Sequence, residues 1–294
     1  MGIILGLTAA LCWGMADFLA RYATRLVGSY RTLLFMQGIG LLILSYYVVA
    51  SGELQRSLGS GWQPWAWLVV ANLLEIASAL ALYRAFEVGV ISVVSPVAAS
   101  YAAVTVVLSF ASGERLEPLR WAGIAAALVG VVLASAGPPP PAAARVKAQV
   151  RGHSFFHSGI ALALFAAVAF GVTFWMYGFL IIPYVGGVIP VWLVRVMTPT
   201  ILLLVARPSG QSVRLPRGSI WWLIIGVGLL DTVAFVANSV GLGTDQVSVV
   251  SVIGSLFSAV TVLLAAVFLH DRLRWSQWLG VAITLVGVAL VSAR

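Results

Sequence analysis

Two carboxylic acids stand near the middle of long apolar segments of this chain. Glu75 lies in the segment near residues 66–87, and Asp231 lies in the segment near residues 220–241. An ionisable group at membrane depth is costly, so its presence there indicates a functional site. Because an apolar medium favours the neutral carboxyl group, either acid can carry a proton and exchange it for a cation. We predict that both acids bind substrate and carry coupling protons; the alternative is a structural carboxylate bonded to a neighbouring helix.

Two amides and a guanidinium accompany these acids. Asn72 precedes Glu75 by three residues and Asn238 follows Asp231 by seven, so on a helix each amide shares a face with its acid. Each amide is predicted either to hydrogen-bond a substrate or to join two helices. Arg195 lies inside another apolar segment. It either binds a substrate carboxylate or neutralises one of the two acids.

Aromatic residues supply the remaining candidates for the wall of a binding site. Trp13, Tyr101 and Trp175 lie in apolar segments, and the faces of such rings attract ammonium groups. The alternative for each ring is packing or contact with lipid. Asp17 follows Trp13 by four residues. We interpret it as a residue that reaches the membrane interface or pairs with Arg21.

The composition indicates a membrane protein. Of the 294 residues 61% are hydrophobic and 9% are charged, whereas a soluble domain carries roughly 25% charged residues. The net charge of +8 does not indicate nucleic-acid binding, because the basic residues lie between apolar segments and form no stripe. The single cysteine, Cys12, excludes an internal disulfide and a cysteine metal cluster. The N-terminus lacks the basic region of a cleavable signal peptide, so we expect the first segment to remain as a helix.

Ten apolar segments have the length needed to cross a bilayer, which is about 20 residues. They lack the alternation of polar and apolar residues that barrel strands show, so all ten are predicted to be helices. The predicted fold class is therefore an all-α integral membrane protein with ten transmembrane helices. We place them near residues 3–20, 31–51, 66–87, 90–111, 120–137, 157–177, 187–206, 220–241, 246–268 and 276–293.

The segments form two copies of one five-helix unit. The sequence of Ile91–Ser95 returns almost unchanged at Val247–Ser251, and Glu75 and Asp231 occupy equivalent positions 156 residues apart. Five is an odd number, so the second copy is predicted to be inverted relative to the first, as in secondary transporters. The predicted domains are residues 1–137 and 157–294, joined by a proline-rich, basic linker at 138–156.

Basic residues gather at one end of the predicted helices. If the N-terminus is cytoplasmic, twelve of them lie outside the cell and only Arg56, Arg115, Arg120 and Arg294 lie inside. The positive-inside rule therefore favours both termini outside the cytoplasm.

Short motifs recur in the same order in both copies. The first copy carries Trp13-Gly14, Val93–Pro96 and Gly113–Leu116, and the second carries Phe170-Gly171, Val249–Ser251 and Asp271–Leu273. Together these motifs resemble the drug/metabolite transporter superfamily, in its ten-helix branch with two EamA-type domains. The resemblance covers almost the whole chain. The second copy lacks one residue of this pattern: Val252 stands where the first copy has Pro96. We therefore do not expect a symmetric pair of proline-bent helices.

The resemblance implies a basket of ten helices whose third, fourth, eighth and ninth members line a central cavity. It also implies alternating access, the transport of small metabolites such as amino acids, commonly as exporters, and cytoplasmic termini. The last implication disagrees with the distribution of basic residues, so the orientation stays open.

The predicted function is a secondary active transporter that exports a small metabolite, such as an amino acid or a related amine, with proton coupling. A small-multidrug-type exporter of cations or drugs is the alternative, and a lipid-carrier flippase is the alternative from another class. No His-Glu-x-x-His motif occurs, so we expect no enzyme, metal or cofactor. We expect a multi-pass protein of the prokaryotic plasma (inner) membrane. Its expected partners are a small-molecule substrate, membrane lipid and protons, and no nucleic acid.

Overall fold

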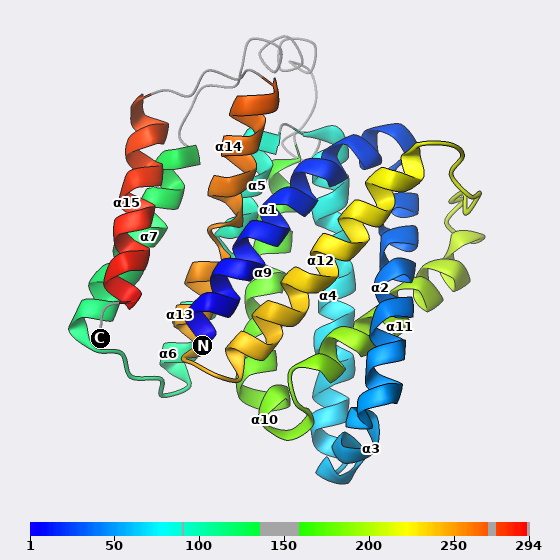
Figure 1. Ribbon diagram of the computed structural model, residues 1–294, viewed down its shortest axis with the longest axis horizontal. Helices are drawn as coiled ribbons and strands as arrows, with labels where there is room; N and C mark the ends of the chain where they lie inside the picture. Colours follow the sequence, from blue (N-terminus) through cyan, green and yellow to red (C-terminus); the bar gives the residue numbers. More distant parts are fainter. Residues whose placement is uncertain (90, 136–158, 270–274, 293–294) are drawn as a thin grey trace.

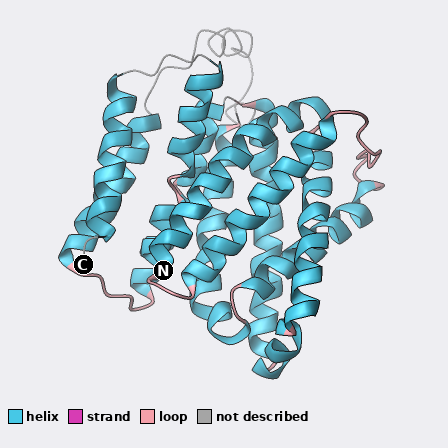
Figure 2. Ribbon diagram, in the orientation of Figure 1, coloured by secondary structure: helices cyan, strands magenta, loops and turns pink. Residues whose placement is uncertain are grey.

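The computed structural model describes residues 1–89, 91–135, 159–269 and 275–292. Within these ranges every element of secondary structure is a helix (Figure 1, Figure 2). A helix satisfies its backbone N–H and C=O groups within one segment, which a lipid environment requires. The all-α prediction is therefore confirmed for the described residues. The predicted linker at 138–156 and the motif at 271–273 lie outside them.

The helices follow the predicted segments closely, and each segment coincides with one helix or with successive helices. The first half contains α1 (Gly2–Val27), α2 (Ser29–Ser51), α3 (Glu53–Ser57), η1 (Leu58–Ser60), α4 (Trp62–Val88), α5 (Ile91–Ala99), α6 (Tyr101–Ala111) and α7 (Pro118–Ser135). The second half contains α9 (Ile160–Met176), η3 (Tyr177–Ile181), α10 (Ile182–Val185), α11 (Val188–Ala206), α12 (Ile220–Leu242), α13 (Val247–Gly254), α14 (Phe257–Leu269) and α15 (Trp275–Ser292).

Among the described residues, eight stretches of helix have the length and apolar composition to cross a membrane. They are α1, α2, α4, α11, α12 and the stretches Val93–Ala111, Ile160–Val185 and Val247–Phe268. The two others, α7 and α15, carry shorter apolar runs and pack against each other at one side of the molecule (Figure 1). Large apolar side chains such as Leu42 and Trp222 face outward, as expected of a surface in contact with lipid. The structure thus supports an integral membrane protein with eight candidate spans, where ten were predicted.

The fourth predicted segment of each half is interrupted. One interruption separates α5 from α6 just before Tyr101, and the other separates α13 from α14 just before Phe257. These two residues are 156 positions apart (257 − 101), which is the spacing of the repeat. The interruptions therefore fall at equivalent places in the two halves.

Proline is not required for this interruption. Pro96 lies inside α5, whereas α13 has Val252 at the equivalent position and is interrupted all the same. At both places a serine hydroxyl donates a hydrogen bond of 2.7 Å to a carbonyl three residues earlier, from Ser100 and from Ser255. Such local bonds compete with the helical ladder. The two fourth segments are therefore interrupted alike, although only the first carries a proline.

The halves hold each other through matching contacts. α1 packs against α12 and α14, and α9 packs against α4, α5 and α6. The hydroxyl of Thr261 on α14 donates to the carbonyl of Gly14 on α1 at 3.2 Å, and the hydroxyl of Thr105 on α6 donates to the carbonyl of Gly171 on α9 at 3.0 Å. Each first helix is thus bonded to the fourth segment of the other half, beside the cavity described next.

Candidate functional site

A buried cavity lies among helices of both halves, beside the interruptions of the fourth segments. About 60 Å³ of it is open to a water-sized molecule, which is room for a few waters. Its polar lining residues are Asp17, Gln37, Glu75, Tyr83, Tyr101 and Asp231. Its aromatic lining residues are Trp13, Phe170, Phe174, Phe235 and Phe257. The cavity therefore combines carboxylates with ring faces.

Glu75 lies on α4 and lines this cavity, as predicted. It is 6% exposed, and its Oε2 has no hydrogen-bond partner. Among the described residues Glu75 forms no ion pair. A carboxylate that is removed from water without a counter-ion is strongly disfavoured, and such a group neutralises by taking a proton or binds a cation. Glu75 is thus a group on which a proton and a cation can compete.

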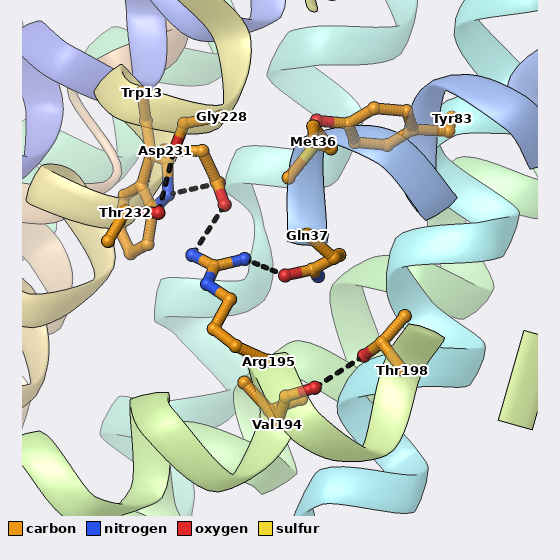
Figure 3. Close-up of polar contacts among 10 residues, drawn as sticks. All are labelled: Trp13, Met36, Gln37, Tyr83, Val194, Arg195, Thr198, Gly228, Asp231 and Thr232. Atoms are coloured by element: carbon orange, nitrogen blue, oxygen red, sulfur yellow. Dashed lines mark hydrogen bonds and ion pairs between the residues drawn. The ribbon is translucent and has the colours of Figure 1, made fainter. Parts of the chain in front are cut away.

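Asp231 lies on α12 and lines the same cavity, but it is bonded on two sides. The indole Nε1 of Trp13 donates to its Oδ1 at 3.2 Å, and Nη2 of Arg195 donates to its Oδ2 at 2.7 Å. Figure 3 shows Arg195 reaching from α11 to lie between Asp231 and Gln37. The guanidinium also donates to Oε1 of Gln37 and lies over the ring of Phe235, with Cζ 5.6 Å from the ring centroid. Of the two alternatives for Arg195, the structure shows neutralisation of Asp231.

The two equivalent acids therefore have different surroundings. Arg195 has no counterpart in the first half, because the equivalent positions 38 and 39 are Gly38 and Ile39. Glu75 is consequently left without the guanidinium that Asp231 has. The difference between the surroundings of the two acids therefore follows from which residue stands at a single helix position.

The predicted amides lie outside the lining of the cavity. Asn72 is fully buried between α4, η3 and α11, where its Oδ1 accepts a bond of 2.6 Å from the hydroxyl of Tyr177 and its Nδ2 contacts the carbonyl of Pro190 at 3.5 Å. Asn72 thus joins helices in this structure. Asn238 is also fully buried, and neither amide atom has a hydrogen-bond partner. It lies beside Gly254 at the end of α13, where an added Cβ would be 3.1 Å from its Oδ1.

Of the three aromatic candidates, two line the cavity and one does not. Trp13 and Tyr101 line the cavity. The hydroxyl of Tyr101 donates to the carbonyl of Ser251 at 3.1 Å. Its ring lies nearly parallel to that of Phe257, with centroids 6.3 Å apart. Trp175 is half-buried elsewhere, and its Nε1 donates to the hydroxyl of Ser112 at the end of α6 at 2.8 Å.

Asp17 is a lining residue that the sequence interpretation missed. It is 7% exposed, its Oδ2 has no hydrogen-bond partner, and it forms no ion pair with Arg21. The prediction of an interface residue is wrong because α1 continues to Val27 rather than ending near residue 20, which places Asp17 inside the molecule. Its spacing of four residues from Trp13 was the available signal.

Gln37 and Tyr83 were also missed. Gln37 is an uncharged polar residue within the apolar α2, so its amide alone marked it as a candidate. Tyr83 lies on α4 two turns after Glu75, on the same helical face. Both line the cavity between the acids and the end of α4.

Comparisons with known proteins agree with this architecture. A model described as the EamA-like transporter family matches residues 1–136 and 157–293. No curated protein matches the chain in sequence. A solved structure titled only "Crystal structure of protein" aligns with a TM-score of 0.72 over 99% of this chain and 96% of its own, at 20% identity. At that identity the likeness concerns the fold alone.

Proposed function

We propose that this protein, which belongs to the EamA-like transporter family, is a secondary active transporter that exports a small metabolite by alternating access. Its family and its eight apolar helices make it a multi-pass membrane transporter. The observation that carries the more specific proposal is Glu75, a buried carboxylate that has no ion pair within the described part of the chain and faces a cavity shared by both halves. The proposed location is a prokaryotic plasma membrane.

Ten membrane helices in two inverted repeats, at residues 1–137 and 157–294, are part of this proposal. The matching bonds of Thr261 to Gly14 and of Thr105 to Gly171 support it. An arrangement of this kind presents one site to each side of the membrane in turn, because the halves can exchange conformations. The equivalent interruptions before Tyr101 and Phe257 lie beside the cavity, where such a rearrangement would alter its walls.

Within this proposal Glu75 carries the coupling proton. The substrate and the proton exclude each other there, so one leaves as the other binds. Asp231 was predicted as a second proton carrier, but it is held by an ion pair with Arg195 and by a hydrogen bond from Trp13. We therefore assign Asp231 to the scaffold of the site. The same ion pair disfavours a flippase, since Arg195 is engaged and offers no free charge to a phosphate headgroup.

Proton movement in liposomes tests this function. Vesicles containing the purified protein and an internal pH dye are mixed with amino acids or amines in turn. A substrate of a proton-coupled transporter changes the internal pH as it crosses, and vesicles containing heat-denatured protein show only the passive leak. Substrate flux without any proton movement would contradict the proposal and indicate a uniporter or an exchanger of two substrates.

A further inference from the structure

Three carboxylates, those of Asp17, Glu75 and Asp231, line the cavity, and no arginine or lysine is among the described residues that line it. The guanidinium of Arg195 lies behind Asp231. Two of its nitrogens are bonded to Asp231 and Gln37. Its Nε is buried without a hydrogen-bond partner among the described residues and lies close to Gly40, where an added Cβ would be 2.9 Å away. Arg195 is fully buried and is not itself part of the cavity wall.

Asp17 and Glu75 remain without a counter-ion among the described residues. They lie on α1 and α4, which contact each other, and each has one oxygen atom with no hydrogen-bond partner. Arg21 lies one turn beyond Asp17 and has two buried nitrogens without a hydrogen-bond partner in the described part of the chain. It forms no ion pair with that acid and is not among the residues that line the cavity. Two buried carboxylates with free oxygens form a site for a positive group.

Rings supply the other part of the wall. The indole of Trp13 lies 5.8 Å from the ring of Phe174 and 6.1 Å from that of Phe235, and Phe170 stacks on Phe174. These rings contact one another beside the two acids. Their faces attract an ammonium group, and their bodies accommodate apolar or aromatic carbon.

We propose that the cavity binds an organic ammonium ion that has an apolar or aromatic body and no carboxylate, with its nitrogen between Asp17 and Glu75. This inference rests on the proposed transport function and narrows its substrate. A zwitterionic amino acid is rejected because its carboxylate would lie among three acids, with no cationic side chain among the described residues that line the cavity.

Three probes that share one phenyl ring test the charge preference: 2-phenylethylamine, phenylalanine and 3-phenylpropanoate. Their binding to the unchanged, detergent-purified protein is measured by thermal unfolding and by titration calorimetry. A ligand that binds only the folded state raises its apparent Tm. We expect 2-phenylethylamine to raise the Tm and the other two to leave it unchanged. Asp17→Asn is expected to weaken the amine by about thirty-fold, since it removes one partner of a buried charge pair.

Glu53→Gln is the matched control, because Glu53 lies on α3 outside the cavity, and we expect it to bind the amine as the unchanged protein does. Equal or stronger binding of phenylalanine or 3-phenylpropanoate overturns the inference, and so does the absence of binding by all three. If the amine binds but no flux occurs in liposomes, the ammonium site stands and the transport function fails. If phenylalanine is transported and the amine is not, transport stands and this inference fails.

Discussion

At the scale of single residues, Glu75 and Asp231 show how two halves with one ancestral pattern can differ in chemistry. They occupy equivalent positions on α4 and α12 and line one cavity. Arg195 neutralises Asp231, and the first half has no arginine at the matching position. Of this equivalent pair, only Glu75 is therefore available to a positive group, which two matching ion pairs would not allow.

Breaking the ion pair from one side is expected to destabilise the fold. Arg195→Gln removes the donor of Gln37 and, among the described residues, leaves Asp231 with only the indole of Trp13 as a donor. Removal of one partner of a buried ion pair costs about 3–5 kcal/mol. The double variant Arg195→Gln/Asp231→Asn removes both charges and should recover part of that loss. Thermal unfolding in detergent measures the effect. A double variant no more stable than Arg195→Gln alone would show that the two side chains act independently.

The sequence alone identified part of this site. Glu75, Asp231, Trp13 and Tyr101 line the cavity because a polar or aromatic group in an apolar helix tends to face the interior. Asn72 could not be placed, since the direction of its face depends on how η3 and α11 pack against α4. Packing between helices of this kind produces no periodic pattern that could be read from a single sequence.

At the scale of elements, the close approach of the first helix to the fourth segment depends on glycine. A Cβ added at Gly14 would lie 2.5 Å from Cβ of Val260 and 2.9 Å from the carbonyl oxygen of Phe257. At Gly171 it would lie 2.5 Å from Cβ of Val104. Small residues of this kind let helices approach closely where hydrophobic force between them is weak.

Alanine at Gly14 is therefore expected to separate α1 from α14. Overpacking costs about 1–3 kcal/mol, so the apparent Tm should fall. Gly38→Ala is the control: this glycine is also inside a helix, and an added Cβ meets nothing within 4 Å. It should be neutral or stabilising by up to about 1 kcal/mol, because alanine is the better helix former. Equal losses for both variants would refute the role of close approach.

The helices themselves were largely predictable, whereas their interruptions were not. Hydropathy marked every segment, since only a helix satisfies its backbone in lipid. The sequence pointed to an interruption at Pro96 but to none in α13, because a local bond from Ser255 has no strong signature in composition. The short η3 and α10 after α9 were missed as well, because they lie between the predicted segments near 157–177 and 187–206.

At the scale of the whole molecule, α1 begins and α15 ends at the same end (Figure 1). Among the described residues, Arg25 at the end of α1 and Arg84 near the end of α4 lie toward the opposite end (Figure 1). Positive residues favour the cytoplasmic side. The distribution thus predicts that both termini face away from the cytoplasm, although the family resemblance implies the reverse.

Reporter fusions at the C-terminus test this orientation. Alkaline phosphatase folds only outside the cytoplasm, and a green fluorescent protein exported in the unfolded state stays dark. We expect the phosphatase fusion to be active and the fluorescent fusion to be dark. A fluorescent fusion without phosphatase activity would place the termini in the cytoplasm. The basic end of the molecule would then face outward, against the positive-inside rule.

The coupling of transport to the proton at Glu75 is tested most directly by Glu75→Gln in liposomes with an imposed proton gradient. Glutamine keeps the size and hydrogen bonding of the side chain but cannot carry a proton. We predict that the variant loses gradient-driven accumulation of substrate and the pH dependence of flux, while Asp231→Asn, which alters the scaffold, lowers the amount of folded protein. Glu75→Gln that transports at the unchanged rate, with unchanged pH and gradient dependence, would contradict the account and make Glu75 a structural carboxylate.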